Sequence, residues 1–342
     1  MKVGIVGAGL IGTRRAEIVR ATPGSELAAV ADIDLKKAKA VTARFGGAAL
    51  SRWEDLVSDG GIQAVIVATP NHLLTPVALA AMEQRKHVLI EKPMGRTPEE
   101  LAKLVESSRK HGVFAAGGFN HRHHPAIRRA RELVRQGAIG DLLFIRARYG
   151  HGGRTGYEKE WRCQADQSGG GELVDQGIHL IDLARWFLGD FDNVFGWTST
   201  GFWPISPLED NAFLLLRNGR GQIASLHVSW TQWKNLFSFE VYGKIGSLTI
   251  EGLGGSYGVE RLIWASRHSS GSGAPEEREE VFPGQDTSWQ TEWNHFLTDI
   301  QSGRSPEPSA EDGLAAMQIV DAVYRLNRSP EPAVSAQPIS HG

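Results

Sequence analysis

Two stretches of the sequence contain residues whose types and spacing could carry out acid–base chemistry. The first is a continuously apolar run that ends in Glu91, Lys92 and Pro93. In open α/β sheets, ligands bind beyond the carboxyl ends of the strands, so a lysine at this point can meet a substrate. A solvated lysine at a strand end is the commoner outcome for a single residue. The position still makes Lys92 a candidate catalytic residue.

The second stretch follows three consecutive glycines, residues 169–171. It holds polar residues at spacings of three, four and three: Glu172, Asp175, His179 and Asp182. On a helix these would share one stripe, with apolar residues on the other side. Asp175 and His179 could touch, and a carboxylate beside an imidazole orients it and raises its basicity, which suits a general base. A salt-bridged surface helix is the alternative, and the spacing alone favours it. The glycines favour a functional site, because they let backbone approach another group closely.

A glycine motif near the start of the chain predicts a dinucleotide site. The residues Gly7-Ala8-Gly9-Leu10-Ile11-Gly12 follow an expected strand and open an expected helix. The first glycine allows a tight turn, the second admits a pyrophosphate, and the third lets helix and strand pack closely. The helix N-terminus then offers free N–H groups to the phosphates. The motif residues expected to contact the dinucleotide are Gly7, Gly9, Leu10, Ile11 and Gly12.

Asp32, at the end of the second expected strand, favours NAD over NADP. Its carboxylate would accept hydrogen bonds from the adenosine ribose and would repel a 2′-phosphate. Four basic residues close in sequence leave NADP open: Arg14, Arg15, Lys36 and Lys37. The alternative is a tight strand–helix turn that binds no ligand. The glycines, the acid and the strand–helix order together argue against this alternative. The full motif spacing also argues against a methyltransferase.

The elements around these residues predict two domains. In residues 1–121, short apolar runs alternate with helix-length segments, the pattern of a parallel sheet covered on both faces. The expected strands are Val3–Val6, Leu27–Ala31, Ala64–Ala68, His87–Ile90 and Val113–Ala116. The expected helices are Ile11–Ala21, Leu35–Phe45, Trp53–Val57, Thr75–Arg85 and Pro98–His111. We therefore expect an α/β Rossmann domain.

Residues 122–328 follow a different pattern. Two helices are expected first, over Pro125–Gln136 and Glu172–Leu188, and then strands joined by tight turns predict an α+β domain with an open, mostly antiparallel sheet. The expected strands are Phe213–Arg217, Gln222–Trp230, Phe237–Tyr242, Ser247–Glu251 and Leu262–Ser266. Helices return at Trp289–Gln301 and Glu311–Leu326. We expect a mobile loop over His268–Glu280 and a disordered tail over 329–342.

Composition excludes several classes of function. The chain has 342 residues, 41% of them apolar, and a formal net charge of −2 with acids and bases well mixed. Nucleic-acid binding is therefore not expected. The single cysteine, Cys163, permits neither an internal disulfide nor a cysteine metal cluster. Neither a signal peptide nor an apolar run long enough to span a bilayer is recognisable. We expect a cytoplasmic protein that does not associate with membranes.

Histidines and tryptophans add one further candidate. A metal site at His121, His123 and His124 is not expected, because neighbouring side chains diverge and no acid or cysteine completes a ligand set. We interpret these histidines as structural or interdomain contacts. Most of the ten tryptophans should lie in the core or a subunit interface. Trp161, in a glycine-flanked stretch beside the expected base, is the one expected near a substrate.

Together these motifs resemble the Gfo/Idh/MocA oxidoreductases, from Lys2 to about Asn327. The resemblance implies hydride transfer between NAD(P) and a hydroxyl carbon of a sugar, sugar derivative or cyclitol. It implies catalytic roles for Lys92, Asp175 and His179. The remaining cofactor contacts would be Thr69, Pro70, Asn71, Glu91, Lys92 and Pro93, and the substrate contacts Asn120, Trp161 and Arg162. It also implies a homodimer or homotetramer formed through the C-terminal sheet.

Two departures from the family pattern stand out. Many members have a histidine at the position of Leu74 and a glycine at that of Arg85. Two other functions stay open. One is a glycosidase that uses bound NAD for transient oxidation and elimination, and the other is a non-catalytic regulator that senses a dinucleotide.

Overall fold

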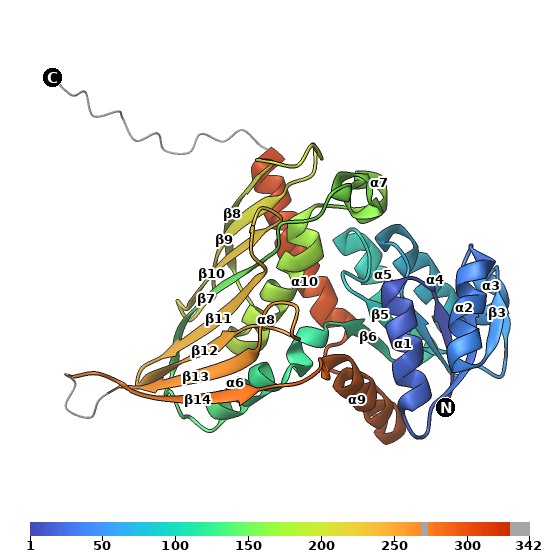
Figure 1. Ribbon diagram of the computed structural model, residues 1–342, viewed down its shortest axis with the longest axis horizontal. Helices are drawn as coiled ribbons and strands as arrows, with labels where there is room; N and C mark the ends of the chain where they lie inside the picture. The colour runs from blue at the N-terminus through green and yellow to red at the C-terminus, as the bar shows by residue number, and fades with distance from the viewer. Residues whose placement is uncertain (268–272, 329–342) are drawn as a thin grey trace.

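The computed structural model describes residues 1–267 and 273–328, which form two sheets (Figure 1). The first sheet has six strands, all parallel, in the order β3-β2-β1-β4-β5-β6. Its strands are β1 (Lys2–Val6), β2 (Glu26–Ala31), β3 (Ala48–Leu50), β4 (Ala64–Val67), β5 (His87–Glu91) and β6 (Ala115–Gly118). This order is that of a dinucleotide-binding Rossmann sheet, so the expected fold of the N-terminal part is confirmed.

Helices cover both faces of this sheet, which explains its uninterrupted apolar strands. They are α1 (Leu10–Ala21), α2 (Leu35–Phe45), α3 (Trp53–Ser58), α4 (Asn71–Glu83) and α5 (Pro98–His111). Residues of α1 and α2 share one core with the sheet, and residues of α3, α4 and α5 share another. Arg85, just after α4, has φ 55°, the left-handed conformation that glycine adopts most easily. The replacement of the family's usual glycine by Arg85 therefore affects only the end of a helix.

The second sheet has eight strands in the order β14-β13-β12-β11-β7-β10-β9-β8. They are β7 (Leu142–Gly150), β8 (Asn193–Ser199), β9 (Asn211–Arg217), β10 (Ile223–Ser229), β11 (Leu236–Gly243), β12 (Gly246–Glu251), β13 (Glu260–Ser266) and β14 (Glu276–Phe282). Only the β7–β10 pair is parallel. The expected open, mostly antiparallel sheet is thus confirmed.

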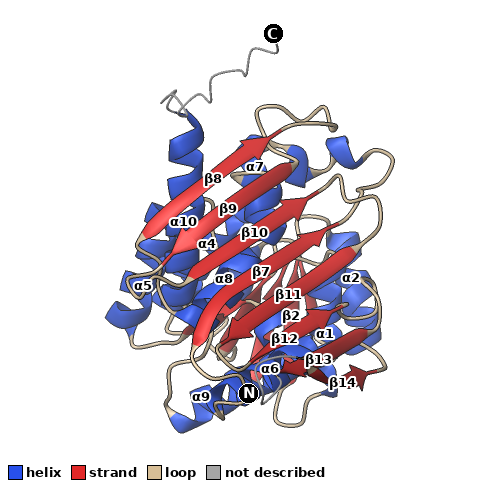
Figure 2. Cartoon of the chain, turned by 90° about the vertical axis from the view of Figure 1, so that its left-hand side faces the viewer, coloured by secondary structure: helices blue, strands red, loops and turns tan. Residues whose placement is uncertain are grey.

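One face of the second sheet is packed against helices, and the other faces outward (Figure 2). The packed face contacts α6 (Pro125–Arg135), α8 (Ile178–Leu188) and α10 (Ala310–Arg328). Strand β9 shows the resulting alternation, with Ala212, Leu214 and Leu216 buried and the residues between them exposed.

The last two helices return to the N-terminal part of the molecule. Helix α9 (Ser288–Ser302) packs on α1, while α10 packs on α5 and also contacts β6 and β8. The Gly117 amide donates to the Pro308 carbonyl at 3.0 Å, which joins the edge strand β6 to the segment before α10. The two halves are therefore connected by more than the chain that links them. No helix within the described ranges is both long and apolar enough to cross a membrane.

Several expected elements were wrong or incomplete. Strands β3, β7 and β8 were not predicted, and neither was β14, which occupies part of the loop expected over His268–Glu280. Strand β14 has the sequence EEREEVF, and as an exposed edge strand it has almost no apolar residues to reveal it. Residues 268–272 of that loop, and the tail expected over 329–342, lie outside the described residues.

Candidate active site

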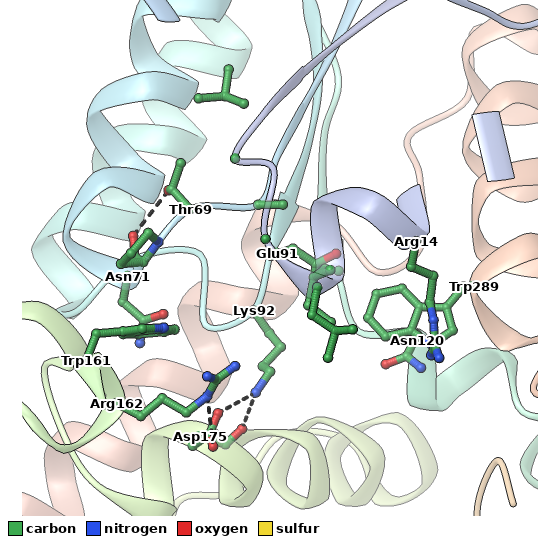
Figure 3. Close-up of a pocket in the computed structure, with 18 of the residues that line it drawn as sticks. Arg14, Thr69, Asn71, Glu91, Lys92, Asn120, Trp161, Arg162, Asp175 and Trp289 are labelled. Carbon is green, nitrogen blue, oxygen red and sulfur yellow. Dashed lines mark hydrogen bonds and ion pairs between the residues drawn. The ribbon is translucent and has the colours of Figure 1, made fainter. Parts of the chain in front are cut away.

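A cavity of about 1060 Å³ lies between the two halves of the molecule. Its walls include the glycine loop and the carboxyl ends of β1, β2, β4 and β5, and the segment Leu253–Tyr257 and α9 contribute from the C-terminal part. This volume is at the upper end for ligand pockets, which suits an extended ligand together with a second, smaller one. Figure 3 shows the side chains that converge on this cavity.

Each of the three glycines in the glycine loop is needed for a different structural reason. A Cβ on Gly7, which has φ 101°, would lie 2.3 Å from the Ala68 carbonyl oxygen. A Cβ on Gly12 would lie 1.8 Å from the Gly7 carbonyl oxygen, so this glycine permits the close approach of α1 to the loop. A Cβ on Gly9 would meet nothing within 4 Å, and Gly9 lines the cavity. The backbone at Gly9 is therefore open to a ligand, as a pyrophosphate at a helix N-terminus requires.

Asp32 lines the same cavity beside the glycine loop. Its Oδ2 accepts from the Ala8 amide at 2.8 Å, and its Oδ1 accepts from the Asp34 amide at 2.8 Å. Each oxygen keeps a second lone pair for a ribose hydroxyl. Arg15, one of the nearby bases, is fully buried and cannot reach a 2′-phosphate.

Glu91 lines the cavity, but its carboxylate already forms an ion pair with a buried arginine outside the cavity. The Arg15 guanidinium donates to Glu91 Oε1 and also lies 2.6 Å from Glu292 Oε2 of α9. This buried triad carries two carboxylates and one guanidinium. Burial raises the pKa of Glu292 to about 7, although the charge of Arg15 opposes the shift. Glu91, an expected cofactor contact, thus also belongs to a triad whose Arg15–Glu292 pair joins the two halves of the molecule.

Lys92 extends from the end of β5 across the cavity to the second domain (Figure 3). Its Nζ donates to the Asp175 carbonyl oxygen at 2.6 Å and to Asp175 Oδ1 at 2.8 Å. Arg162 Nε lies 3.6 Å from Asp175 Oδ2. Enclosure of the Asp175 carboxylate opposes ionisation, but the charges of Lys92 and Arg162 prevail and lower its pKa below its ordinary value. Asp175 therefore holds two cations side by side.

The helix that carries Asp175 differs from the expected one. Residues Leu173–Gly177 form a π-helical turn, and α8 begins only at Ile178. The expected polar stripe is also wrong, because Glu172 and Asp182 are wholly buried. Asp182 accepts from Arg122 at 2.6 and 2.8 Å, which makes it a structural ion pair rather than part of the site. A π-turn shifts the register, so spacing counted on a regular α-helix misplaces these side chains.

His179 reaches the cavity but not through the contact expected from the sequence. No hydrogen bond joins Asp175 to His179 in the part of the chain that the structure describes, because Asp175 is turned toward Lys92. The His179 ring instead stacks on His121, with centroids 3.7 Å apart and planes 17° apart. Burial, together with the charge of Lys92, lowers the pKa of His179 well below its ordinary value. The imidazole is therefore neutral at neutral pH and can accept a proton.

The remaining expected residues lie around the cavity with two exceptions. Thr69, Pro70 and Asn71 line it at the start of α4, as do Leu10 and Ile11 of α1 and the three expected substrate residues, Asn120, Trp161 and Arg162. Gly12 and Pro93 are not part of its wall. Leu74 is wholly buried in the core.

Sequence reasoning did not identify several residues that line the cavity. They are His121, His124, Tyr149, Tyr257, Asp286 and Trp289. Asp286 and Trp289 come from the start of α9, more than 250 residues after the glycine loop, and Arg14 lies 5.5 Å from the Trp289 ring centroid. Structural or interdomain contacts are expected of these histidines, and His124 Nδ1 does lie 2.9 Å from Glu260 Oε2 in a buried pair, while His121 and His124 also line the cavity. No described group of three or more His, Cys, Asp or Glu residues is arranged to hold a metal ion.

Comparison with known proteins now decides the family. Residues 1–131 match the family model described as "Oxidoreductase family, NAD-binding Rossmann fold", and residues 127–249 match the "GFO/IDH/MocA C-terminal domain". An uncharacterized oxidoreductase of Rhizobium meliloti is 30% identical over 329 residues, 93% of this chain and 95% of the relative. The chain belongs to the Gfo/Idh/MocA family. It is thus an NAD-binding oxidoreductase, and the wall of the cavity at Gly9 and Asp32 has the openness and the acceptor groups that NAD requires.

Two further comparisons concern one kind of family member. The levoglucosan dehydrogenase of Pseudarthrobacter phenanthrenivorans is 28% identical over 283 residues, which are 72% of this chain and 73% of the relative. A solved structure titled "Levoglucosan dehydrogenase, complex with NADH and levoglucosan" is 26% identical, with a TM-score of 0.86 over 95% of this chain and 96% of that chain. The similarity therefore extends through both domains.

Proposed function

We propose that this Gfo/Idh/MocA protein oxidises a hydroxyl group of a sugar, sugar derivative or cyclitol and reduces the corresponding ketone in the reverse direction. The observation that carries the proposal is that Lys92, Asp175 and His179 line the same cavity as the NAD-binding glycine loop. Relatives described as levoglucosan dehydrogenase and inositol 2-dehydrogenase support this substrate class.

Three side chains have distinct roles in the proposed reaction. When bound, NAD supplies the hydride acceptor. Lys92, held by Asp175, donates a hydrogen bond to the substrate oxygen and stabilises the negative charge that develops there. His179, kept neutral by its buried position, takes the proton of the hydroxyl group and returns it in ketone reduction. Asp175 thus acts through Lys92 rather than through His179.

The residues proposed to contact NAD are those at the glycine loop and at the ends of β2, β4 and β5. Gly9, Leu10, Ile11 and Asp32 line the cavity at the ends of β1 and β2, and Thr69, Pro70 and Asn71 line it between the end of β4 and the start of α4. Trp161, Arg162 and Asn120 would border the substrate. Of these three, Arg162 lies nearest the proposed catalytic group, because its guanidinium pairs with the same Asp175 carboxylate as Lys92.

The outward face of the second sheet supports a proposal about assembly. Phe195, Trp197 and Phe213 are 58%, 54% and 48% exposed, and Leu215 and Ile223 on β9 and β10 extend the same apolar patch. A contiguous apolar surface of this kind is a place where a monomer would bury area by self-association. We propose a homodimer or homotetramer formed through this face.

A substrate screen tests the proposed function. Mass spectrometry of the purified protein identifies bound cofactor, and a panel of sugars and cyclitols is then incubated with NAD while NADH absorbance is followed. Formation of NADH with at least one polyol supports the proposal. Release of a leaving group from glycosides without net NADH would favour the glycosidase instead. Intact NAD binding with no turnover of any compound would favour a regulator.

A further inference from the structure

The stacked pair of His121 and His179 is the feature of the site that the reaction scheme leaves unexplained. His179 has no hydrogen-bond partner on Nδ1, which is buried among the described residues. A catalytic imidazole is ordinarily oriented by a hydrogen bond to its second nitrogen. Here the contacts of the ring are instead aromatic: the face of His121 at 3.7 Å and the edge of Phe119 at 5.9 Å between centroids.

His121 is itself fixed by a directed chain of hydrogen bonds. Asn120 donates through Nδ2 to Ser288 Oγ at 2.9 Å, and Ser288 Oγ donates to Asp286 Oδ1 at 2.6 Å. Because the Asn120 amide group donates to Ser288, its Oδ1 is left as an acceptor, 3.2 Å from His121 Nδ1. The chain therefore requires the proton of neutral His121 to lie on Nδ1. It ends on the carboxylate of Asp286, just before the start of α9.

The surroundings of the pair keep His121 neutral. Charged and titratable groups lie around the pair: Lys92 just after β5, Asp175 of the π-turn, His124 of the same segment as His121, and Tyr149 of β7. Burial, then the neighbouring His179 and His124, lower the pKa of His121 well below its ordinary value. A neutral ring stacked face to face can stabilise the imidazolium that His179 becomes when it takes a proton. A second charged imidazole at this distance could not.

We propose that His121 is the positioning residue for His179, holding its imidazole by stacking in place of the usual hydrogen bond. The inference rests on the proposed function of His179 as the proton acceptor. The Asn120–Ser288–Asp286 hydrogen bonds connect this ring to the segment at the start of α9, and we expect them to contribute less than the stacking itself. The stacking also explains why Asp175 is free to hold Lys92.

Two substitutions of His121 separate the effect of its aromatic face from the effect of its hydrogen bonds. His121→Leu removes the aromatic face, whereas His121→Phe keeps the face and removes both nitrogens. We expect His121→Leu to lower kcat/KM by roughly 10- to 100-fold, since a small misplacement of a reacting group can cost about 100-fold. We expect His121→Phe to stay within a few-fold of the wild type. NAD affinity, measured by titration, should be unchanged in both variants.

A second readout needs no substrate. Side-chain NMR of labelled histidine gives the pKa of His179 in the free protein. We expect the pKa of His179 to be kept in His121→Phe, whose ring still stabilises the imidazolium, and to fall further in His121→Leu, which removes that ring. A matching downward shift should be seen in the acidic limb of the kcat/KM profile. A merely structural role for His121 would lower the melting temperature and leave both pH readouts in place.

The outcomes distinguish the inference from the proposed function. Loss of activity in His179→Ala with normal kcat/KM and pH readouts in His121→Leu would overturn the positioning role alone. Equal impairment of His121→Phe and His121→Leu, with both folded by circular dichroism, would also overturn it, because stacking would not be the cause. Full activity of His179→Ala would instead contradict the proposed function itself.

Discussion

The ammonium group of Lys92 lies 2.8 Å from Asp175 Oδ1 and 2.6 Å from the Asp175 carbonyl oxygen. This pair joins the end of a strand in the Rossmann half to a π-turn in the other half. Both side chains are only partly buried, so the pair borders the cavity rather than the core. The contact thus spans the cavity that lies between the two sheets.

Asp175→Asn should test whether this carboxylate acts through Lys92. The amide keeps the size of the side chain but loses the charge that holds both Lys92 and Arg162. We expect kcat to fall roughly 10- to 100-fold because Lys92 is no longer oriented, and NAD affinity to stay the same. Asp166→Asn, an exposed carboxylate on the neighbouring short helix α7 (Ala165–Ser168), is the control and should be neutral. Equal rates in the two variants would contradict the role given to Asp175.

Two glycine substitutions should have opposite consequences. Gly9→Ala places a methyl group where nothing lies within 4 Å and where φ is −73°, so stability should change by no more than about 0.5 kcal/mol. That methyl group occupies the cofactor space, and NAD affinity should fall about tenfold or more. Gly12→Ala forces a Cβ to 1.8 Å from the Gly7 carbonyl oxygen and should destabilise the fold by roughly 1–3 kcal/mol. Thermal melts and NAD titration check both, and unaltered NAD affinity in a folded Gly9→Ala protein would contradict this placement.

The buried triad of Arg15, Glu91 and Glu292 predicts a pH-dependent stability. The pKa of Glu292 is raised from 4.5 to about 7 in the folded protein, so the folded state binds more protons than the unfolded state between these values. Stability contributed by this group is therefore full below pH 4.5 and is lost as the pH rises toward 7. Relative to Glu292→Gln, the wild type should lose on the order of 2–3 kcal/mol between about pH 5 and 8.

Denaturant titrations at several pH values measure this difference. Glu17→Gln, at an exposed position of α1, is the matched control and should follow the wild type. Parallel curves for the wild type and Glu292→Gln would show that Glu292 does not titrate in this range.

The outward face of the second sheet predicts self-association. Phe213→Glu introduces a charge at the centre of the apolar patch, beside His227, on which Phe213 stacks at 4.1 Å. We expect light scattering after gel filtration to show a dimer or tetramer for the wild type and smaller species for the variant. Ile245→Glu, in the turn between β11 and β12, changes an exposed apolar residue elsewhere and should leave assembly intact. A monomeric wild type would contradict the proposal.

Much of the Rossmann half could be predicted because its signals are local. The strands there are buried on both faces and therefore continuously apolar, and each glycine of the loop has a backbone reason that a sequence pattern preserves. Lys92 could be placed because β5 ends immediately before it. These inferences needed only the order of neighbouring elements.

The rest of the site depends on contacts that sequence spacing does not report. A π-turn at Leu173–Gly177 changed the side-chain register, so Asp175 meets Lys92 and not His179. His121 was expected to make a structural or interdomain contact, and its stacking on His179, which lies 58 residues further along the chain, could not be read from sequence spacing. Strand β14 was missed because a charged edge strand has no apolar alternation to reveal it. In each case tertiary packing decided the outcome.

The rate of NADH formation by Lys92→Met, measured with saturating NAD and the polyol that the wild type oxidises fastest, tests the central claim most directly. Methionine keeps the length and apolar stem of the side chain but removes the ammonium group. We predict a rate about 100- to 10,000-fold below the wild type, as for the loss of a group that assists proton transfer or stabilises charge, with NAD affinity unchanged. A rate within a few-fold of the wild type would contradict the assignment of Lys92, and the same result in His179→Ala would contradict the whole scheme.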